Sequence, residues 1–255
     1  MSNILAIAQK ELKGYFASPI GYIVLGFFAL MFGYFFYALL IIFNQQSMRM
    51  AGFGGGPALN INDQLIRPVF LNMSVVLLFI LPMLTMRTYS EEKRSGTIEL
   101  LLTSPLTDLQ IIMGKFLGAM ALFATMLALT LIHVGALFAF GNPEWRPVAT
   151  GYLGVLLMGG CFVALGLLIS SLTRNQIVAG MVTFALFLML WVIDWVSQFT
   201  GPTAQGILNY LSITTHLDDF TRGIIDTKHL VYYLSFIAFG LFLTARSVDT
   251  ERWRG

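Results

Sequence analysis

Two features of this sequence could carry chemistry: a compact run of charged residues and one histidine inside an apolar stretch. The charged run is Glu91, Glu92, Lys93 and Arg94. Charges packed this closely can pair with a partner protein, or they can simply solvate a loop between two membrane helices. Each charge taken singly fits the second interpretation, whereas their ordered combination with the residues that follow favours the first.

The histidine, His133, lies deep in an apolar segment predicted to cross a membrane. An ionisable residue in such a place is a functional hypothesis by default, although a neutral imidazole can also just hydrogen-bond a neighbouring helix. No HExxH motif and no second histidine deep in the membrane accompany it, so a metal site is not expected. The single cysteine, Cys161, excludes an intrachain disulfide and a zinc site built on paired cysteines.

The composition excludes a water-soluble fold. Of the 255 residues, 57% are hydrophobic and only 11% are charged, whereas soluble domains carry about 25% charged residues. The apolar residues form long blocks, so we expect an all-α integral membrane protein. The net charge of +2 comes without a basic tract, which argues against nucleic-acid binding. The glycine run at positions 52–56 lacks the Lys and Ser or Thr of a phosphate-binding loop, so no cofactor is expected in this chain.

Six segments meet or nearly meet the length of about 20 apolar residues that a spanning helix needs. They are Ile20–Phe43, Val69–Met86, Phe116–Phe140, Val148–Leu172, Ile177–Val196 and His229–Ala245. The fourth contains small residues that allow close helix approach, either inside the chain or at a dimer interface: Gly151, Gly154, Gly159, Gly160 and Gly166. We predict one transmembrane domain over residues 1–255.

An amphipathic helix is predicted before the first span, over residues 1–18. Its apolar residues fall at helical spacing, and Pro19 ends it. The apolar set is Leu5, Ala8, Leu12, Tyr15 and Phe16. Such a helix would lie in the membrane interface.

The basic residues predict the orientation. With both termini in the cytoplasm of a bacterial cell, ten of the fifteen Lys and Arg residues face inward, as the positive-inside rule requires. They are Lys10, Lys13, Arg87, Lys93, Arg94, Lys115, Arg174, Arg246, Arg252 and Arg254. The polar loop at 87–110 is then cytoplasmic. The loop at 197–228 is extracytoplasmic, as an amphipathic cap over the spans or, less simply, a partner surface.

The cytoplasmic loop is predicted to hold a short helix parallel to the membrane. Gly96 offers a break, Thr97 can cap the helix, and Pro105 follows its end at Leu102. Its apolar side would be Ile98, Leu101 and Leu102, with Glu99 facing away. A second capped start at Thr107 or Asp108 leads into the third span. A short helix flanked by exposed carboxylates and joined to two spans is a lever that a cytoplasmic protein could push.

The loop sequence YSEEKRSGTIELLLTSPL, residues Tyr89–Leu106, resembles the signature loop of ABC-2-type transporter permeases. The similarity is closest to the gliding-motility-type branch. It extends to the opening AIAQKELKGYFASPIGY, to the turn at Asn175 and Gln176, and to the late segment HLDDFTRGIIDT. It therefore covers essentially the whole chain.

The resemblance implies a half-transporter in the bacterial inner membrane, with an elbow helix at Leu5–Phe16 and a coupling helix between spans two and three. The coupling helix would dock into a separate ABC ATPase subunit, which binds the ATP and Mg. Carried over onto this sequence, its contact residues are Glu91, Glu92, Arg94, Gly96, Thr97 and Glu99. The resemblance also implies a second permease copy or a related permease. By analogy only, it suggests an auxiliary membrane subunit with an extracytoplasmic domain.

Two other classes of protein remain open from the residues alone. An intramembrane enzyme would need a converging catalytic set, and His133 has no evident partner. An ion-coupled carrier would ordinarily show midplane carboxylates or broken helices, and the spans are nearly free of charge. No pathway residue identifies a substrate.

Overall fold

The computed structural model describes residues 2–52 and 59–252, and all regular structure in these ranges is helical. The glycine run after Gly52 and the basic Arg254 lie outside them. The elements are α1 Ser2–Ala17, α2 Pro19–Gly52, the π-helical turn η1 Asn62–Ile66, α3 Arg67–Thr85, α4 Ser90–Ser95, α5 Thr97–Leu102, α6 Asp108–Phe140, α7 Trp145–Leu172, α8 Gln176–Ser197, α9 Pro202–Leu211, α10 Ile213–Thr221 and α11 Thr227–Arg252.

Among the described residues, six helical segments are long and apolar enough to cross a membrane: α2, the stretch Asn62–Ser95 (which contains α3), α6, α7, α8 and α11. The prediction of an all-α membrane protein with six spans is confirmed. Several helices outrun the predicted spans; α2, for example, has 34 residues and is about 50 Å long. Hydropathy locates only the part inside the hydrocarbon, about 30 Å thick, and a helix can continue beyond it because its hydrogen bonds are internal.

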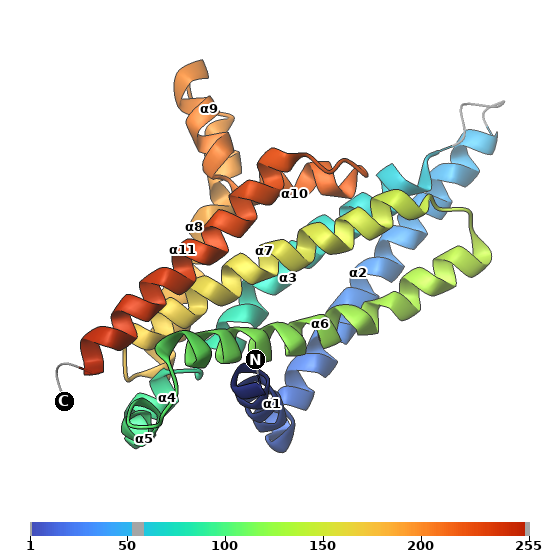
Figure 1. Ribbon diagram of the computed structural model, residues 1–255. Coiled ribbons are helices and arrows are strands. Elements are labelled where there is room, and N and C mark those ends of the chain that lie inside the picture. Colours follow the sequence, from blue (N-terminus) through green and yellow to red (C-terminus); the bar gives the residue numbers. More distant parts are fainter. Residues whose placement is uncertain (1, 53–58, 253–255) are drawn as a thin grey trace.

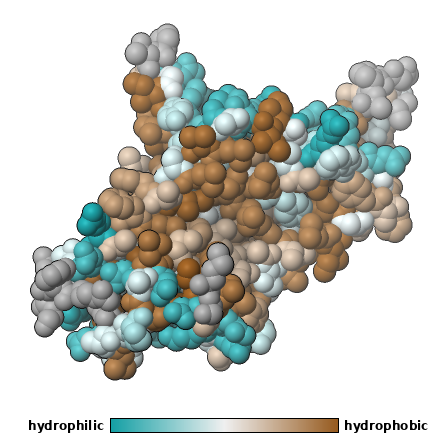
Figure 2. Space-filling model, in the orientation of Figure 1, coloured by the Kyte–Doolittle hydropathy of each residue, from teal (hydrophilic) through white to brown (hydrophobic). Residues whose placement is uncertain are grey.

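The helix α7 is the centre of the bundle. Its most apolar stretch is 67% buried, as is that of the α3 segment, against 17% for α2 and α8. In Figure 1, α7 runs between α11 and α6 with α3 beside it. Figure 2 shows hydrophobic residues over the middle of one face, with hydrophilic residues gathered toward its ends.

The glycines of α7 account for this central position. A Cβ at Gly151 would lie 2.4 Å from Phe70 of α3, and one at Gly159 would lie 2.1 Å from Phe123 of α6. All five α7 glycines face other helices of this chain. Their predicted packing role is therefore confirmed, and the contacts are internal ones instead of a dimer interface.

The helices α1, α4 and α5 lie together at one end of the bundle, where α11 also finishes; we call this the α1 end (Figure 1). The opposite end, the α10 end, carries α9 and α10. The first and last described residues, Ser2 and Arg252, thus both belong to the α1 end.

The predicted N-terminal helix is α1, and Pro19 begins the next helix as expected. Its packing includes a contact that was not predicted. Leu5 is 64% exposed, whereas Ile7 is buried against α6, where a Cβ at Gly114 would lie 2.6 Å from the Ile7 side chain. The absence of a side chain at Gly114 of α6 allows Ile7 to pack there. This contact depends on another helix, so no pattern within α1 could predict it.

The loop at 197–228 forms α9 and the amphipathic α10, whose Ile213, Leu217 and Phe220 are fully buried. Asp218 binds Arg67 at 2.7 Å and Arg222 at 2.8 Å. These internal contacts favour the predicted cap over the spans.

Candidate functional site

The loop between α3 and α6 folds into two short helices at the α1 end. Gly96, with φ of 75°, ends α4 and is the N-cap residue of α5. A left-handed backbone favours glycine, so the predicted break is correct. The predicted cap is wrong: Thr97 is the first helical residue, and its hydroxyl lies 2.9 Å from Ser95 Oγ. Thr107 caps α6 with a complete capping box, which decides between the two predicted starts.

A buried lysine holds this loop to the bundle. Lys115 of α6 is 1% exposed, and its Nζ donates to Glu92 Oε1 at 2.8 Å, to Glu11 Oε1 at 3.0 Å and to the Thr88 carbonyl at 2.9 Å. We call these four residues the Lys115 cluster. It joins α1, α4 and α6, because each helix contributes one charged group. Removing one partner of such a buried ion pair would leave an uncompensated charge and would lower the stability of the fold.

In the sequence analysis Lys115 served only as a marker of topology. The carboxylates flanking the short helix were also predicted to be exposed, and this is wrong for Glu92, whose side chain is 17% exposed and turned toward Lys115. The available signal was the position of Lys115, two turns inside an apolar helix, where an unpaired ammonium would be costly.

Two further contacts fix α4. Lys93, 3% exposed, binds Glu251 of α11 at 2.6 Å. Ser170 of α7 accepts hydrogen bonds from the backbone N–H groups of Tyr89 and Ser90, both at 3.0 Å. The first turn of a helix has free N–H groups, and Ser170 supplies their acceptor from another span. The short helix α4 is therefore bound directly to α6, α7 and α11, and through Lys115 it is connected to α1.

The other predicted contact residues face outward. Glu91 is 49% exposed and pairs with Arg87 at 2.9 Å, and the remaining four are exposed: Arg94, Gly96, Thr97 and Glu99. Ile98 is buried, as predicted for the apolar side of α5, and the side chains of Leu101 and Leu102 lie outside the described part. Sequence reasoning missed Leu100, an apolar side chain that is 74% exposed on this surface.

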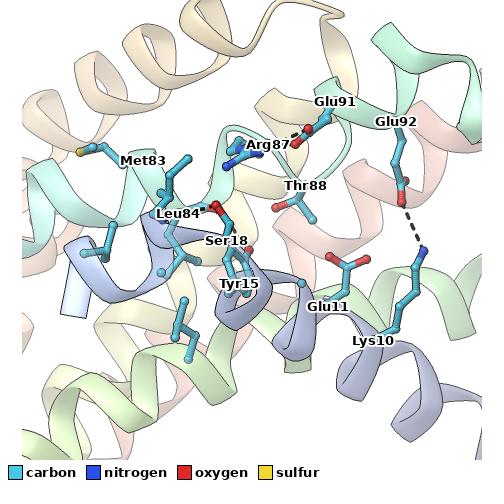
Figure 3. A pocket seen from close by; sticks show the side chains of 15 residues that line it. Lys10, Glu11, Tyr15, Ser18, Met83, Leu84, Arg87, Thr88, Glu91 and Glu92 are labelled. Atoms are coloured by element: carbon cyan, nitrogen blue, oxygen red, sulfur yellow. Dashed lines mark hydrogen bonds and ion pairs between the residues drawn. The ribbon is translucent and has the colours of Figure 1, made fainter. Parts of the chain in front are cut away.

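A cavity of about 320 Å³ lies between α1, the start of α2, the end of α3 and α4 (Figure 3). Charged groups line one side of it, among them Lys10, Glu11 and Glu92. Tyr15 also lines it and donates to the Leu84 carbonyl at 3.1 Å. Burial raises the pKa of Tyr15 well above its usual range, so the hydroxyl remains a neutral donor.

His133 takes no part in this site. Its ring lies against Phe32 and Phe36 of α2, with ring centroids 5.4 and 5.5 Å away. Within the described residues, its buried Nδ1 has no hydrogen-bond partner, so this atom does not make the hydrogen bond to a neighbouring helix that was the simpler alternative. Nor do these residues hold any group of three or more metal-ligating side chains.

A second polar cluster, at the α10 end, was missed. His216 of α10 and His229 of α11 face each other through a hydrogen bond between their Nδ1 atoms, and His229 Nε2 lies 2.6 Å from Asp219 Oδ2. Both rings are 3% exposed. Burial lowers the pKa of His216. The signal was the presence of two of the three histidines within fourteen residues, next to Asp219.

Comparison with known proteins agrees with this architecture. The family model described as ABC-2 family transporter protein matches residues 5–245. The chain belongs to this family. Members of the ABC-2 family are the transmembrane subunits of ABC transporters, whose ATPase activity lies in a separate subunit. The six apolar helices of the described residues agree with a multi-pass membrane subunit of this kind.

Individual relatives support the same assignment. The probable multidrug ABC transporter permease YbhR of Escherichia coli strain K12 is 32% identical over 143 residues, which is 55% of this chain and 38% of the relative. YbhR of Escherichia coli O157:H7 matches to the same extent. The chain thus spans less than half the length of these curated relatives.

Proposed function

We propose that this chain is the permease subunit that couples ATP hydrolysis in a separate nucleotide-binding subunit to export, or to mechanical work across the cell envelope. The observation that carries the proposal is the arrangement of α4 and α5. They present an exposed charged surface at one end of the bundle, while the buried Lys115 cluster ties them to α1 and α6.

The outward side chains form the ATPase contact in this proposal. We define the docking surface as Glu91, Arg94, Gly96, Thr97, Glu99 and Leu100. An exposed apolar residue surrounded by charges is the usual composition of a protein contact, with an apolar anchor and a polar rim. Glu92 is assigned a different role, because it faces Lys115 and not the surface.

Motion would pass from the docking surface to the spans through the buried contacts. A push on α4 moves Glu92, and with it Lys115 on α6 and Glu11 on α1. The pair of Lys93 and Glu251 extends the same connection to α11. Rigid-body displacement of packed helices is an established way to switch a transporter between states.

The remaining assignments are parts of the same proposal. The protein lies in the inner membrane of a bacterial cell. The α1 end faces the cytoplasm, because nine of the ten predicted inward basic residues lie in described segments at that end. ATP and Mg bind to the partner ATPase. Residues 1–255 form one ABC-2-type domain, which pairs with a second copy or a related permease.

The resemblance of the loop supports the gliding-motility-type branch and, with it, an auxiliary membrane subunit bearing an extracytoplasmic domain. The relatives carry the name of a probable multidrug permease. These two indications point to different cargoes, so the proposal names no substrate.

Co-purification tests the proposal. The tagged chain is expressed with the ABC ATPase encoded beside it, and the ATPase retained in detergent is quantified. Leu100→Asp removes the exposed anchor, and Phe199→Asp is the matched control, since Phe199 is 89% exposed at the α10 end. We expect about tenfold less ATPase with Leu100→Asp, as for loss of an interface anchor, and none lost with the control. Absence of ATPase from the wild-type preparation, or equal capture by Leu100→Asp, would refute the docking surface.

A further inference from the structure

The cavity beside α1 has a polar end and an apolar end. Glu11, Glu91 and Glu92 line the polar end together with Lys10 and Arg87. The apolar end is lined by Ile20, Val24, Met83, Leu84 and Leu122. Ile20 is 41% exposed and Met83 is 49% exposed, so this end reaches the surface among side chains that face lipid. A volume of about 320 Å³ is within the usual range for small-molecule sites, about 300–1,000 Å³.

Two buried oxygen atoms at the polar end lack partners. Among the described residues, neither Glu92 Oε2 nor Thr88 Oγ1 meets the geometry of a hydrogen bond, although the Thr88 hydroxyl lies close enough to the Tyr15 hydroxyl to oppose the rise in its pKa. Thr88 is only 5% exposed. Both residues line the cavity. Buried polar atoms are rarely left without a partner, because the loss of hydration costs free energy. An ionised carboxylate only accepts hydrogen bonds, so the missing partner of Glu92 Oε2 must be a donor small enough to enter the cavity, and the Thr88 hydroxyl can accept from the same donor.

The charges specify what kind of donor fits. A single buried ammonium, that of Lys115, serves both Glu11 and Glu92. Lys10 adds little, because its side chain is 70% exposed and its Nζ is 4.0 Å from Glu92. Arg87 is committed to Glu91. One more cation with several N–H donors would balance the second carboxylate and satisfy both free oxygens.

We propose that this cavity binds a phospholipid whose headgroup carries a primary ammonium, taken from the leaflet at the α1 end. The ammonium donates to Glu92 Oε2 and Thr88 Oγ1. The phosphate lies at the rim beside Lys10, whose side chain is 70% exposed, and the acyl chains follow the apolar wall past Met83 and out into the bilayer. A headgroup of this kind matches both signs of charge that the cavity presents.

Other phospholipids fit less well for stated reasons. A quaternary ammonium has no N–H group and leaves both oxygens unpaired. An anionic headgroup adds negative charge beside three carboxylates. The site therefore discriminates by headgroup, which a plain apolar groove would not do. It does not depend on ATPase docking, so each proposal can fail while the other stands.

Gly14 provides a clean test of the site. It lines the cavity, and a Cβ added there meets nothing within 4 Å. Gly14→Leu would fill the space without a clash, and leucine also favours a helix over glycine. Gly26 of α2 is the matched control, because its Cβ is equally free and it does not line the cavity. Thr88→Val removes one acceptor while keeping the backbone carbonyl that binds Lys115.

The full-length chain is reconstituted in vesicles of equal parts phosphatidylethanolamine, phosphatidylcholine and phosphatidylglycerol, extracted, and examined by native mass spectrometry for retained lipid. We expect wild type and Gly26→Leu to retain phosphatidylethanolamine about tenfold over the other two, the effect of one or two charge-assisted hydrogen bonds. Gly14→Leu should abolish retention, and Thr88→Val should reduce the preference.

Three results would overturn the proposal. Wild type could retain the three lipids equally, Gly14→Leu could retain as much phosphatidylethanolamine as Gly26→Leu, or soluble glycerophosphoethanolamine could displace the lipid completely. The last result would assign the cavity to a soluble amine in place of a phospholipid.

Discussion

Lys115 Nζ on α6 lies 3.0 Å from Glu11 Oε1 on α1, although 104 residues of chain separate them. The same ammonium binds Glu92 on α4 at 2.8 Å. One buried side chain thus connects the N-terminal helix, the loop predicted to contact an ATPase, and a membrane span. The following predictions test this connection and the architecture around it.

Replacing Lys115 by Met should lower the free energy of unfolding by about 3–5 kcal/mol, because Glu11 and Glu92 would be left as unpaired buried carboxylates. Thermal unfolding in detergent measures the change. Lys13→Met, at an exposed position of α1, is the control and should change little. Adding Glu11→Gln and Glu92→Gln to the Lys115→Met variant should recover stability. If it does not, the cluster does not act as an electrostatic unit.

The two neighbouring glutamates should behave differently. Glu92→Gln weakens the contact between α4 and Lys115, so amide hydrogens of α1 should exchange faster with solvent. Glu91→Gln breaks only a half-exposed pair with Arg87, worth about 0.3–0.5 kcal/mol, and should leave α1 unchanged. Hydrogen exchange followed by mass spectrometry distinguishes them. Equal protection of α1 in both variants would remove Glu92 from the proposed route of transmission.

The protein should lose stability as the pH falls below the unfolded pKa of histidine, about 6.5. Burial lowers the pKa of His216 in the fold; the Tyr210 carbonyl and Asp219 oppose the shift, and His229 and Lys228 add to it. Between the folded and the unfolded pKa the unfolded chain binds more protons, so stability rises with pH across that window and is lost on acidification.

Melting temperatures measured from about pH 5 to pH 8 test this dependence. His216→Asn should flatten the slope on the acid side. An unchanged slope in the variant would mean that His216 does not titrate in this window.

Gly159→Ala should destabilise the bundle by about 1–3 kcal/mol through overpacking. Its Cβ would lie 2.1 Å from the Phe123 ring, and neither α6 nor α7 can move away without disturbing other contacts. Gly135→Ala on α6, where a Cβ meets nothing within 4 Å, is the control. Phe123→Leu combined with Gly159→Ala should restore part of the melting temperature. A stable Gly159→Ala protein would contradict the close contact of α6 with α7.

Labelling with a membrane-impermeant thiol reagent should show that the α1 end and the α10 end of the bundle lie on opposite sides of the membrane. Cys161 is fully buried, so it adds little background. Leu100→Cys should react only in inside-out vesicles and Phe199→Cys only in intact cells, because the α1 end is proposed to face the cytoplasm. Labelling of both from one side would overturn the six-span topology, and the reverse pattern would overturn the orientation.

Several features of the site were within reach of sequence analysis. The backbone at Gly96, the capping box at Thr107 and the break before Pro19 depend only on residues close in the chain. The exposure of Arg94 and Glu99 also followed from the polarity of the loop. The direction of Glu92 did not, because it depends on a lysine of another helix.

The packing of α1 shows the same limit. Its periodicity identified an amphipathic helix. Ile7 is nevertheless buried, because Gly114 on α6 leaves space for its side chain, whereas Leu5 is exposed. The face that a helix buries is decided by the surface it meets.

The sequence by itself determined the class of protein, the six spans and the place of the polar loop. A bilayer demands long uninterrupted apolar segments, and such segments are a local property of the chain. Tertiary structure alone decided that Lys115 binds Glu11 and Glu92, that His216 meets His229, and that a cavity remains beside α1. These depend on how helices far apart in sequence rotate and approach, which is set by side-chain packing and not by any pattern within one segment.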